Sequence, residues 1–368
     1  MAKWHGRMVP AGLLMAPDRV VECETMARPE YHNMPSHEYK DKPEVLKAKI
    51  ELLAQLMQQA HNCVAYTGAG LSVSSGLADY ATKAQESVEA RQIVDSRYLA
   101  QPNAGHKALA SLHKHGFVKR VFNQNHDGLL QKAGLPQSAV NEIHGAFFDP
   151  SNPGGFELRG DLVEDMFNWA AQTDLCLALG TSLSGLNADR LARSPAKKYA
   201  PGRATTGSDE DAKQNGALGL VIVNLQETQL DKFSTLRIFA DLDDVMPLLA
   251  EELRIPAATP APLACACDLP DVFSGLPYNS AGDLDPNASA TLDLRVNAQF
   301  KVTKGNFAGC RGVVAGKNPE GHYLLKVTMH VGEGISIEED LLLASWFLLE
   351  AKSAQISSLP IIQPQNMK

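Results

Sequence analysis

The chain has 368 residues, of which 44% are hydrophobic, and its formal net charge is -8 at pH 7. This length and composition predict a globular protein with one large domain and one small one. The acidic balance gives no general attraction for nucleic acid or anionic membranes, and the longest apolar runs are too short to cross a membrane.

The first part of the chain predicts an extension followed by an α/β unit. Residues 1–41 read as an N-terminal extension, in which prolines interrupt a short apolar patch and no signal-peptide cleavage site follows. Residues 42–60 carry apolar side chains at helical spacing and lead into an apolar strand at 64–66. Further strand-like runs alternate with helical stretches, and they lie at 118–122, 175–179 and 220–225. This alternation predicts a Rossmann-like parallel sheet with helices on both faces.

A Gly-Ala-Gly turn follows the first of these strands. Gly68 and Gly70 lack a Cβ, so the backbone can turn sharply and approach a pyrophosphate. The N–H groups of a following helix start would then face the negative charge. Taken alone, the motif fits a tight strand-to-helix turn without a ligand equally well.

The remaining chain divides into loop, linker and a second small domain. The polar stretch 188–219 reads as a mobile loop, and the Pro/Ala-rich range 255–290 reads as a linker. Alternating strand segments over 291–350 predict a small SH3- or KOW-like β-barrel, followed by a tail at 351–368. We expect this barrel to pack on the main domain or to bind protein, rather than to act as a KOW module.

Six scattered cysteines show no disulfide spacing, which predicts a reduced, intracellular chain. A zinc site built from Cys265, Cys267 and Cys310 is disfavoured, because CxC with one distant cysteine is poor metal spacing. No metal-binding residue is therefore assigned.

Ordered sequence blocks downstream of the Gly-Ala-Gly turn carry a family resemblance. The blocks read NQNHDGLLQKAG, VNEIHG, LALGTSL and VIVNLQET, and they begin at Asn123, Val140, Leu177 and Val221. Together they resemble the sirtuins, NAD-dependent protein-lysine deacylases, over residues 42–254, which we expect to form the NAD-binding domain. The wording is most similar to the nuclear class that includes the mammalian sixth and seventh sirtuins.

The resemblance implies roles for individual residues. His144 would be the base that activates the ribose hydroxyl, and a near-neutral pKa suits an imidazole to this task. Asn125 would be a second catalytic residue that orients the sugar and a water. The residues expected to bind NAD are Gly68, Ala69, Gly70, Ser72, Asp79, Tyr80, Gln124, Asn125, Asp127, Gly180, Thr181, Ser182, Asn224, Leu225, Gln226 and Leu242.

The chain also departs from the family pattern. The family segment GIPDFR reads GLADYA from Gly76 to Ala81, so a proline and a cofactor-contacting arginine are missing. Residues 146–173 contain no cysteine, although sirtuins carry two zinc-binding cysteine pairs there. We therefore expect a reduced small lobe, with Arg159-Gly160-Asp161 at the place of the family's substrate-binding turn.

Two classes of function remain open. The first is an enzyme that removes acyl groups from lysine and releases nicotinamide and O-acyl-ADP-ribose, or that hydrolyses NAD or transfers ADP-ribose with the same pocket. The second is a degenerate, catalytically weak sirtuin that serves as a structural or binding subunit of a larger assembly. An acyl-lysine protein would be the partner in the first class, and that assembly in the second.

Overall fold

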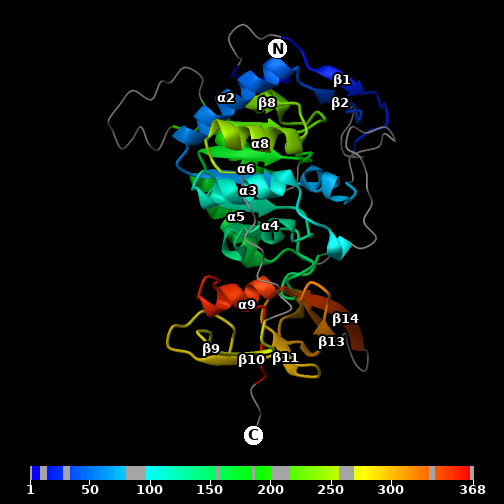
Figure 1. The fold of residues 1–368 in the computed structure, drawn as a ribbon, viewed down its shortest axis with the longest axis vertical. Coiled ribbons are helices and arrows are strands. Elements are labelled where there is room, and N and C mark those ends of the chain that lie inside the picture. Colours follow the sequence, from blue (N-terminus) through cyan, green and yellow to red (C-terminus); the bar gives the residue numbers. More distant parts are fainter. Residues whose placement is uncertain are drawn as a thin grey trace. The chain divides into compact units, whose positions relative to one another are not determined.

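The computed structural model describes residues 2–8, 15–27, 34–79, 97–154, 157–184, 187–199, 216–256, 269–330 and 336–364. The chain divides into two compact units, which are described separately below (Figure 1). The first comprises Met1–Gln124 and Val163–Thr259, and the second comprises Asn125–Leu162 and Pro260–Lys368. Tyr80, Cys265 and Cys267 lie outside the described residues.

A six-stranded sheet carries the predicted α/β fold. Its strands are β3 (Cys63–Thr67), β4 (Arg120–Asn123), β5 (Val140–Glu142), β6 (Leu175–Leu179), β7 (Gly219–Val223) and β8 (Leu236–Ile238). They lie in the order β5-β4-β3-β6-β7-β8, and the pairings from β4 through to β8 are parallel. The predicted Rossmann-like sheet is thereby confirmed. From the β3/β6 pair, the strand order continues to β4 and β5 on one side and to β7 and β8 on the other. Ligand crevices of open α/β sheets form where the strand order reverses in this way.

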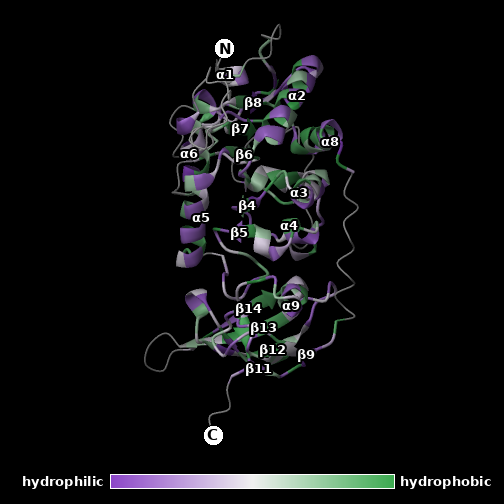
Figure 2. Cartoon of the chain, turned by 90° about the vertical axis from the view of Figure 1, so that its left-hand side faces the viewer, coloured by the Kyte–Doolittle hydropathy of each residue, from purple (hydrophilic) through white to green (hydrophobic). Residues whose placement is uncertain are grey.

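Helices cover both faces of the strands in the first unit. Figure 2 shows α2 (Pro43–Gln59), α3 (Ala104–Lys114) and α8 (Leu242–Glu252) on one side, with α5 (Gly160–Gln172) and α6 (Arg190–Lys198) on the other. The predicted amphipathic helix before the first strand is confirmed as α2, which buries Ile50, Leu53 and Met57 on one face. Apolar strands buried on both sides are typical of a parallel sheet covered in this way.

Helix α6 corrects the prediction of a loop over 188–219. The sequence of α6 is polar and contains Pro195, and such a composition is typical of an irregular loop. Yet Leu191, Ala192, Pro195 and Ala196 are buried, and their spacing places them on one helical face. This short apolar stripe indicates a helix in the sequence, but the polar residues around it favoured the prediction of a loop.

Described parts of the N-terminal segment pack into the first unit. They form α1 (Ala2–His5), β1 (Asp18–Val21) and β2 (Glu38–Lys40). The Trp4 ring lies 5.2 Å from the Tyr39 ring and 5.7 Å from the Phe239 ring, measured between centroids. Lys49 donates to the Trp4 carbonyl at 3.0 Å and forms a buried ion pair with Asp41 at 2.7 Å. These described parts of the predicted N-terminal extension, residues 1–41, therefore contribute to the core.

The second unit contains an antiparallel sheet of five strands in the order β14-β13-β12-β11-β15. Their bounds are β11 (Gln299–Val302), β12 (Arg311–Lys317), β13 (Tyr323–His330), β14 (Ser336–Leu343) and β15 (Ile361–Ile362). A separate pair joins β9 (Val272–Leu276) to β10 (Ala290–Asp293), and the helices are α4 (Leu129–Lys132) and α9 (Ser345–Lys352). Strand β9 lies inside the range that the sequence assigns to a linker.

Segment 125–162 packs against the C-terminal elements of this second unit. The Phe148 ring lies 5.4 Å from the Trp346 ring and 4.9 Å from the His322 ring. Trp346 Nε1 donates to Gln137 Oε1 at 3.0 Å, and the Gln137 N–H donates to Glu350 at 2.6 Å. The segment that carries Asn125, Asp127 and His144 thus shares its core with the C-terminal sheet and α9.

Candidate functional site

Four of the sequence motifs lie where strands of the first unit end. Gly68 follows β3, Gln124 follows β4, Gly180 follows β6 and Asn224 follows β7. Because these strands are parallel, their carboxyl ends share one edge of the sheet. The predicted cofactor residues of this unit are therefore gathered at the edge where such sheets bind ligands.

The Gly-Ala-Gly turn is packed tightly against the Gly180-Thr181 turn. A Cβ on Gly68 would lie 2.8 Å from the Gly180 carbonyl oxygen, and one on Gly70 would lie 2.9 Å from Gly180 Cα. Gly180 itself has φ +60, and its Cβ would lie 2.5 Å from the Leu71 nitrogen. All three glycines are required because two loops meet backbone to backbone.

Two amide groups of this turn hold it against the neighbouring loop. The Gly68 N–H donates to Leu179 O at 3.0 Å, and the Gly70 N–H donates to Gly180 O at 2.9 Å. The turn continues into short 3-10 helices at Ala69–Leu71 and Val73–Ser75. The expected helix start after the turn is therefore a 3-10 helix.

Gln124 and Thr181 are brought into direct contact. Gln124 Nε2 donates to Thr181 Oγ1 at 2.8 Å, and the Leu183 N–H approaches the same oxygen at 3.4 Å. Thr181 is buried, while Gln124 and Ser182 are half-buried. Two predicted cofactor segments that are far apart in the sequence are therefore joined by one side-chain hydrogen bond.

Ser72 belongs to a polar network that sequence reasoning missed. Its hydroxyl lies 3.3 Å from Nε2 of the buried His106, whose Nδ1 lies 2.6 Å from Asn103 Oδ1. Because the Asn103 oxygen can only accept, Nδ1 carries the proton and Nε2 of the neutral ring accepts from Ser72. Asn103 also caps α3 and donates to Leu71 O at 2.6 Å. The sequence pattern that could have indicated this network is an asparagine at a helix start, three residues before a histidine.

The loop Asn224–Gln226 is held by a buried arginine. Arg237 donates to the carbonyl oxygens of Asn224 at 2.9 Å and Gln226 at 2.6 Å. Its Nε donates to Asp231 at 2.9 Å, and its guanidinium lies 3.5 Å from the Phe239 ring centroid. Burial lowers the pKa of Arg237 and raises that of Asp231, while their mutual attraction opposes both shifts. Arg237 therefore sets the shape of the predicted adenosine loop.

The other predicted residues of the first unit lie on the same loops. Leu242 is buried at the start of α8, where the Asp241 side chain accepts from the Asp243 N–H. Ala69 and Asp79 are half-buried, and Leu225 is buried.

Asn125, Asp127 and His144 belong to the second unit. Asp127 is buried, and its carboxylate accepts from the Leu129 N–H at 3.0 Å at the start of α4. Asn125 and His144 are half-buried. His144 lies in a turn that is closed by a 3.0 Å bond from the Gly145 N–H to Glu142 O, and Gly145 has φ +102. The turn needs glycine at this position because φ lies in the left-handed region.

Known proteins resemble this chain in sequence. The Sir2 family model matches residues 83–151. The NAD-dependent protein deacetylase sirtuin-7 of Rattus norvegicus is 30% identical over 268 residues, covering 58% of this chain and 62% of that protein. The NAD-dependent protein deacetylase SRT1 of Arabidopsis thaliana is 28% identical over 263 residues, covering 59% of this chain and 52% of that protein. These matches make the chain similar to the sirtuins.

The chain spans less than two thirds of the length of these relatives. A solved structure of a Sir2 enzyme aligns with it at a TM-score of 0.44 and 22% identity, over 56% of this chain and 98% of that one. Sirtuin-7 and a Sirt6 protein of Drosophila melanogaster are both among its relatives. This agrees with the class that the sequence wording indicates.

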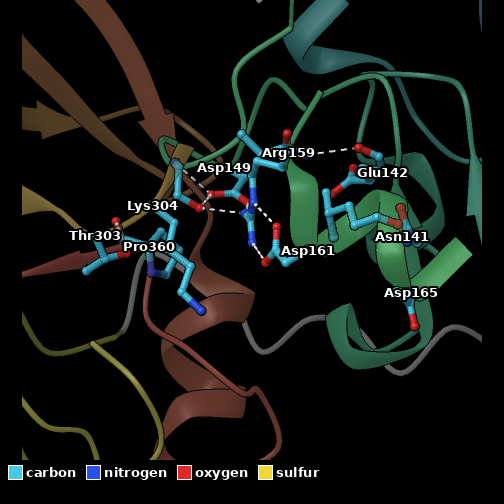
Figure 3. Close-up of polar contacts among 12 residues, drawn as sticks. Asn141, Glu142, Asp149, Arg159, Asp161, Asp165, Thr303, Lys304 and Pro360 are labelled. Atoms are coloured by element: carbon cyan, nitrogen blue, oxygen red, sulfur yellow. Dashed lines mark hydrogen bonds and ion pairs between the residues drawn. The ribbon is translucent and has the colours of Figure 1, made fainter. Parts of the chain in front are cut away.

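Arg159 and Asp161, which the sequence analysis expects at the place of the family's substrate-binding turn, belong to an ionic cluster (Figure 3). Arg159 binds Asp161 at 2.6 Å, Ser151 Oγ at 2.9 Å and Asp149 at 3.4 Å. Within the second unit, a Cβ on Gly305 would collide with the Ser151 carbonyl oxygen. Through these contacts the Arg159 side chain holds together the segment that follows His144.

Among the described residues, no group of three or more metal-binding side chains is found. None of the described helices has both the length and the apolar character needed to cross a membrane. Cys63 and Cys176 are buried as free thiols on neighbouring strands, and burial raises the pKa of both.

We expect Thr181→Val to weaken NAD binding without unfolding the protein. The change removes the acceptor for Gln124 Nε2 while nearly keeping the side-chain volume. Loss of one hydrogen bond of about 0.5–1.5 kcal/mol corresponds to a dissociation constant about two- to twelvefold higher, measurable by calorimetry. Thr303→Val, which removes a hydroxyl bonded to Leu359 O in the second unit, is the matched control. An unchanged dissociation constant in Thr181→Val would remove this residue from the site.

Glu142 should make stability dependent on pH. Burial raises its pKa to about 8, and the carboxyls of Asp149 and Asp127 add to the shift. The folded state therefore binds a proton that the unfolded chain releases near pH 4.5, so this stabilisation is complete below pH 4.5 and is lost as pH rises through about 8.

Glu142→Gln keeps a neutral side chain at this position at every pH. Urea unfolding from pH 5 to pH 9 should show the wild type losing stability relative to the variant as pH rises. Glu338→Gln on the exposed face of β14 serves as a control that should follow the wild type. Parallel pH curves for the wild type and Glu142→Gln would show that Glu142 is ionised in the fold.

Proposed function

We propose that this protein is an NAD-dependent protein-lysine deacylase that releases nicotinamide and O-acyl-ADP-ribose. The observation that carries the proposal is the contact between loops at the carboxyl ends of the strands around β3 and β6, where the strand order reverses. There the Gly68–Gly70 turn packs on Gly180, and Gln124 reaches Thr181 at 2.8 Å. The relatives, named as NAD-dependent protein deacetylases, support the same reaction.

The side chains at this edge fit a dinucleotide. Gln124, Thr181, Ser182, Asn224 and Gln226 offer amide and hydroxyl groups, which suit ribose hydroxyls and phosphate oxygens. NAD, when bound, supplies the ADP-ribosyl group and nicotinamide as the leaving group. The positive charge that phosphates favour is reduced in this chain, because the family arginine is replaced by Ala81.

The protein's own groups would carry proton transfer and orientation. His144 would accept the proton of the ribose hydroxyl, and Asn125 would orient the sugar through its amide. The substrate would be an acyl-lysine of another protein. We further propose an intracellular location in the nucleus or cytoplasm, which the free buried thiols of Cys63 and Cys176 support.

The C-terminal sheet has its own proposed role. Its short antiparallel strands, with left-handed glycines at Gly305, Gly309 and Gly316, support an SH3- or KOW-like module that binds protein. Its contacts with segment 125–162 support a second role in holding the proposed catalytic segment.

A degenerate sirtuin that acts within a larger assembly is the second candidate. One observation favours it: the N–H groups of Gly68 and Gly70 are donated to backbone carbonyls rather than directed to a phosphate. NAD hydrolysis or ADP-ribose transfer would use the same residues without an acyl-lysine.

Incubation of the full chain with NAD and a panel of acyl-lysine peptides tests the enzyme. Mass spectrometry should show loss of the acyl group from at least one peptide, only with NAD present. Binding of NAD without loss of any acyl group would support the degenerate candidate.

A further inference from the structure

His126 occupies the variable position between Asn125 and Asp127, and sequence reasoning gave it no role. Its ring Nδ1 lies 3.0 Å from the Gly145 carbonyl oxygen. Because a carbonyl oxygen can only accept, Nδ1 must carry the proton and donate it. The His126 side chain thus binds the residue directly after His144.

Several further contacts fix the same imidazole. It stacks on the Phe147 ring with centroids 5.6 Å apart and planes inclined by 26°. The Phe147 N–H donates to the His126 carbonyl oxygen at 2.8 Å. Gly154 lies against the ring so closely that a Cβ there would be 2.7 Å from Nδ1. The ring is therefore confined by residues that follow the turn that carries His144.

The turn itself has both polar groups of Gly145 engaged. The Gly145 N–H donates to Glu142 O at 3.0 Å, which closes the four-residue turn with His144 at its third position. The Gly145 carbonyl is held by His126. Gly145 has φ +102, and a Cβ on it would lie 2.6 Å from Gly154 Cα. Without the His126 bond, the peptide after His144 would lose this side-chain anchor.

We infer that His126 is a positioning residue: its Nδ1–H holds the Gly145 carbonyl and thereby fixes the turn from which His144 acts as base. The inference rests on the proposed function only for its kinetic consequence. Its structural consequence, an ordered turn at 142–147, is independent of activity.

The test compares three full-length variants with the wild type. His126→Asn keeps an N–H donor close to the position of Nδ1, and His126→Leu removes the donor while keeping bulk. Gly154→Ala leaves His126 in place and displaces its ring. Hydrogen exchange followed by mass spectrometry reports order over residues 142–147, and steady-state kinetics report kcat and KM separately.

In His126→Leu and Gly154→Ala, exchange should rise at 142–147 and stay unchanged in the first unit. Deacylation kcat should fall about tenfold or more, as for a misplaced general base, while KM for NAD and exchange of labelled nicotinamide persist. His126→Asn should remain close to the wild type in every readout.

Two results would overturn the inference. One is unchanged exchange at 142–147 in His126→Leu. The other is equal loss in the Asn and Leu variants, which would show that the ring only fills space. If the wild type releases no acyl group, the proposed function fails, and the exchange comparison alone still decides the role of His126.

Discussion

His144→Ala should lower deacylation turnover by about 10²- to 10⁴-fold, the range typical of a removed general base. NAD affinity should remain nearly unchanged, because the imidazole acts on the ribose hydroxyl during the reaction and not in ground-state binding. Nicotinamide release should partly survive, since bond cleavage precedes the step that needs the base. Steady-state kinetics and calorimetry measure the two quantities, with the exposed His61→Ala as the matched control.

Asn125→Ala gives the contrasting result within the same experiment. Its amide is expected to orient the sugar that is attacked, so its loss should suppress nicotinamide release itself. If the wild type and both variants release nicotinamide at the same background rate, neither residue is catalytic.

Arg237→Met should destabilise the first unit by about 3–5 kcal/mol, because it leaves the carboxylate of Asp231 buried without its cation. It also removes the donors to the Asn224 and Gln226 carbonyls, so NAD affinity should fall as well. At about 2–4 °C per kcal/mol for a unit of this size, the melting temperature should drop by roughly 10 °C.

Arg295→Met is the control for this change. Arg295 pairs with Asp293 at the surface, and the melting temperature should stay at the wild-type value. In the double variant Arg237→Met, Asp231→Asn, removal of the orphaned charge should restore part of the loss. An Arg237→Met protein as stable as the wild type would show that this buried pair contributes nothing.

The sequence predicted those helices and strands that a local pattern of apolar residues specifies. Strands β3, β6 and β7 are unbroken apolar runs, and α2 shows its apolar residues at helical spacing. The ordered motifs also lie at the strand ends, as the sequence predicted. Helix α6 escaped prediction because four small or medium apolar residues were hidden among charges.

The features of the candidate site that were not predicted depend on tertiary contacts, which no local sequence pattern encodes. Arg237 reads as an exposed charge on a short strand, although its four hydrogen bonds bury it completely. His126 reads as a variable residue within a motif. Gly68 and Gly70 were correctly singled out, but the contact they need is with Gly180, whose distance in the sequence hides it.

Nicotinamide release by the full-length chain, followed with NAD in the presence and absence of an acylated lysine peptide, tests the central claim most directly. The proposal predicts release that depends on the acyl group and that matches the amount of peptide deacylated. Absence of release under both conditions would contradict it, and release that is equal with and without peptide would replace the deacylase with an NAD hydrolase.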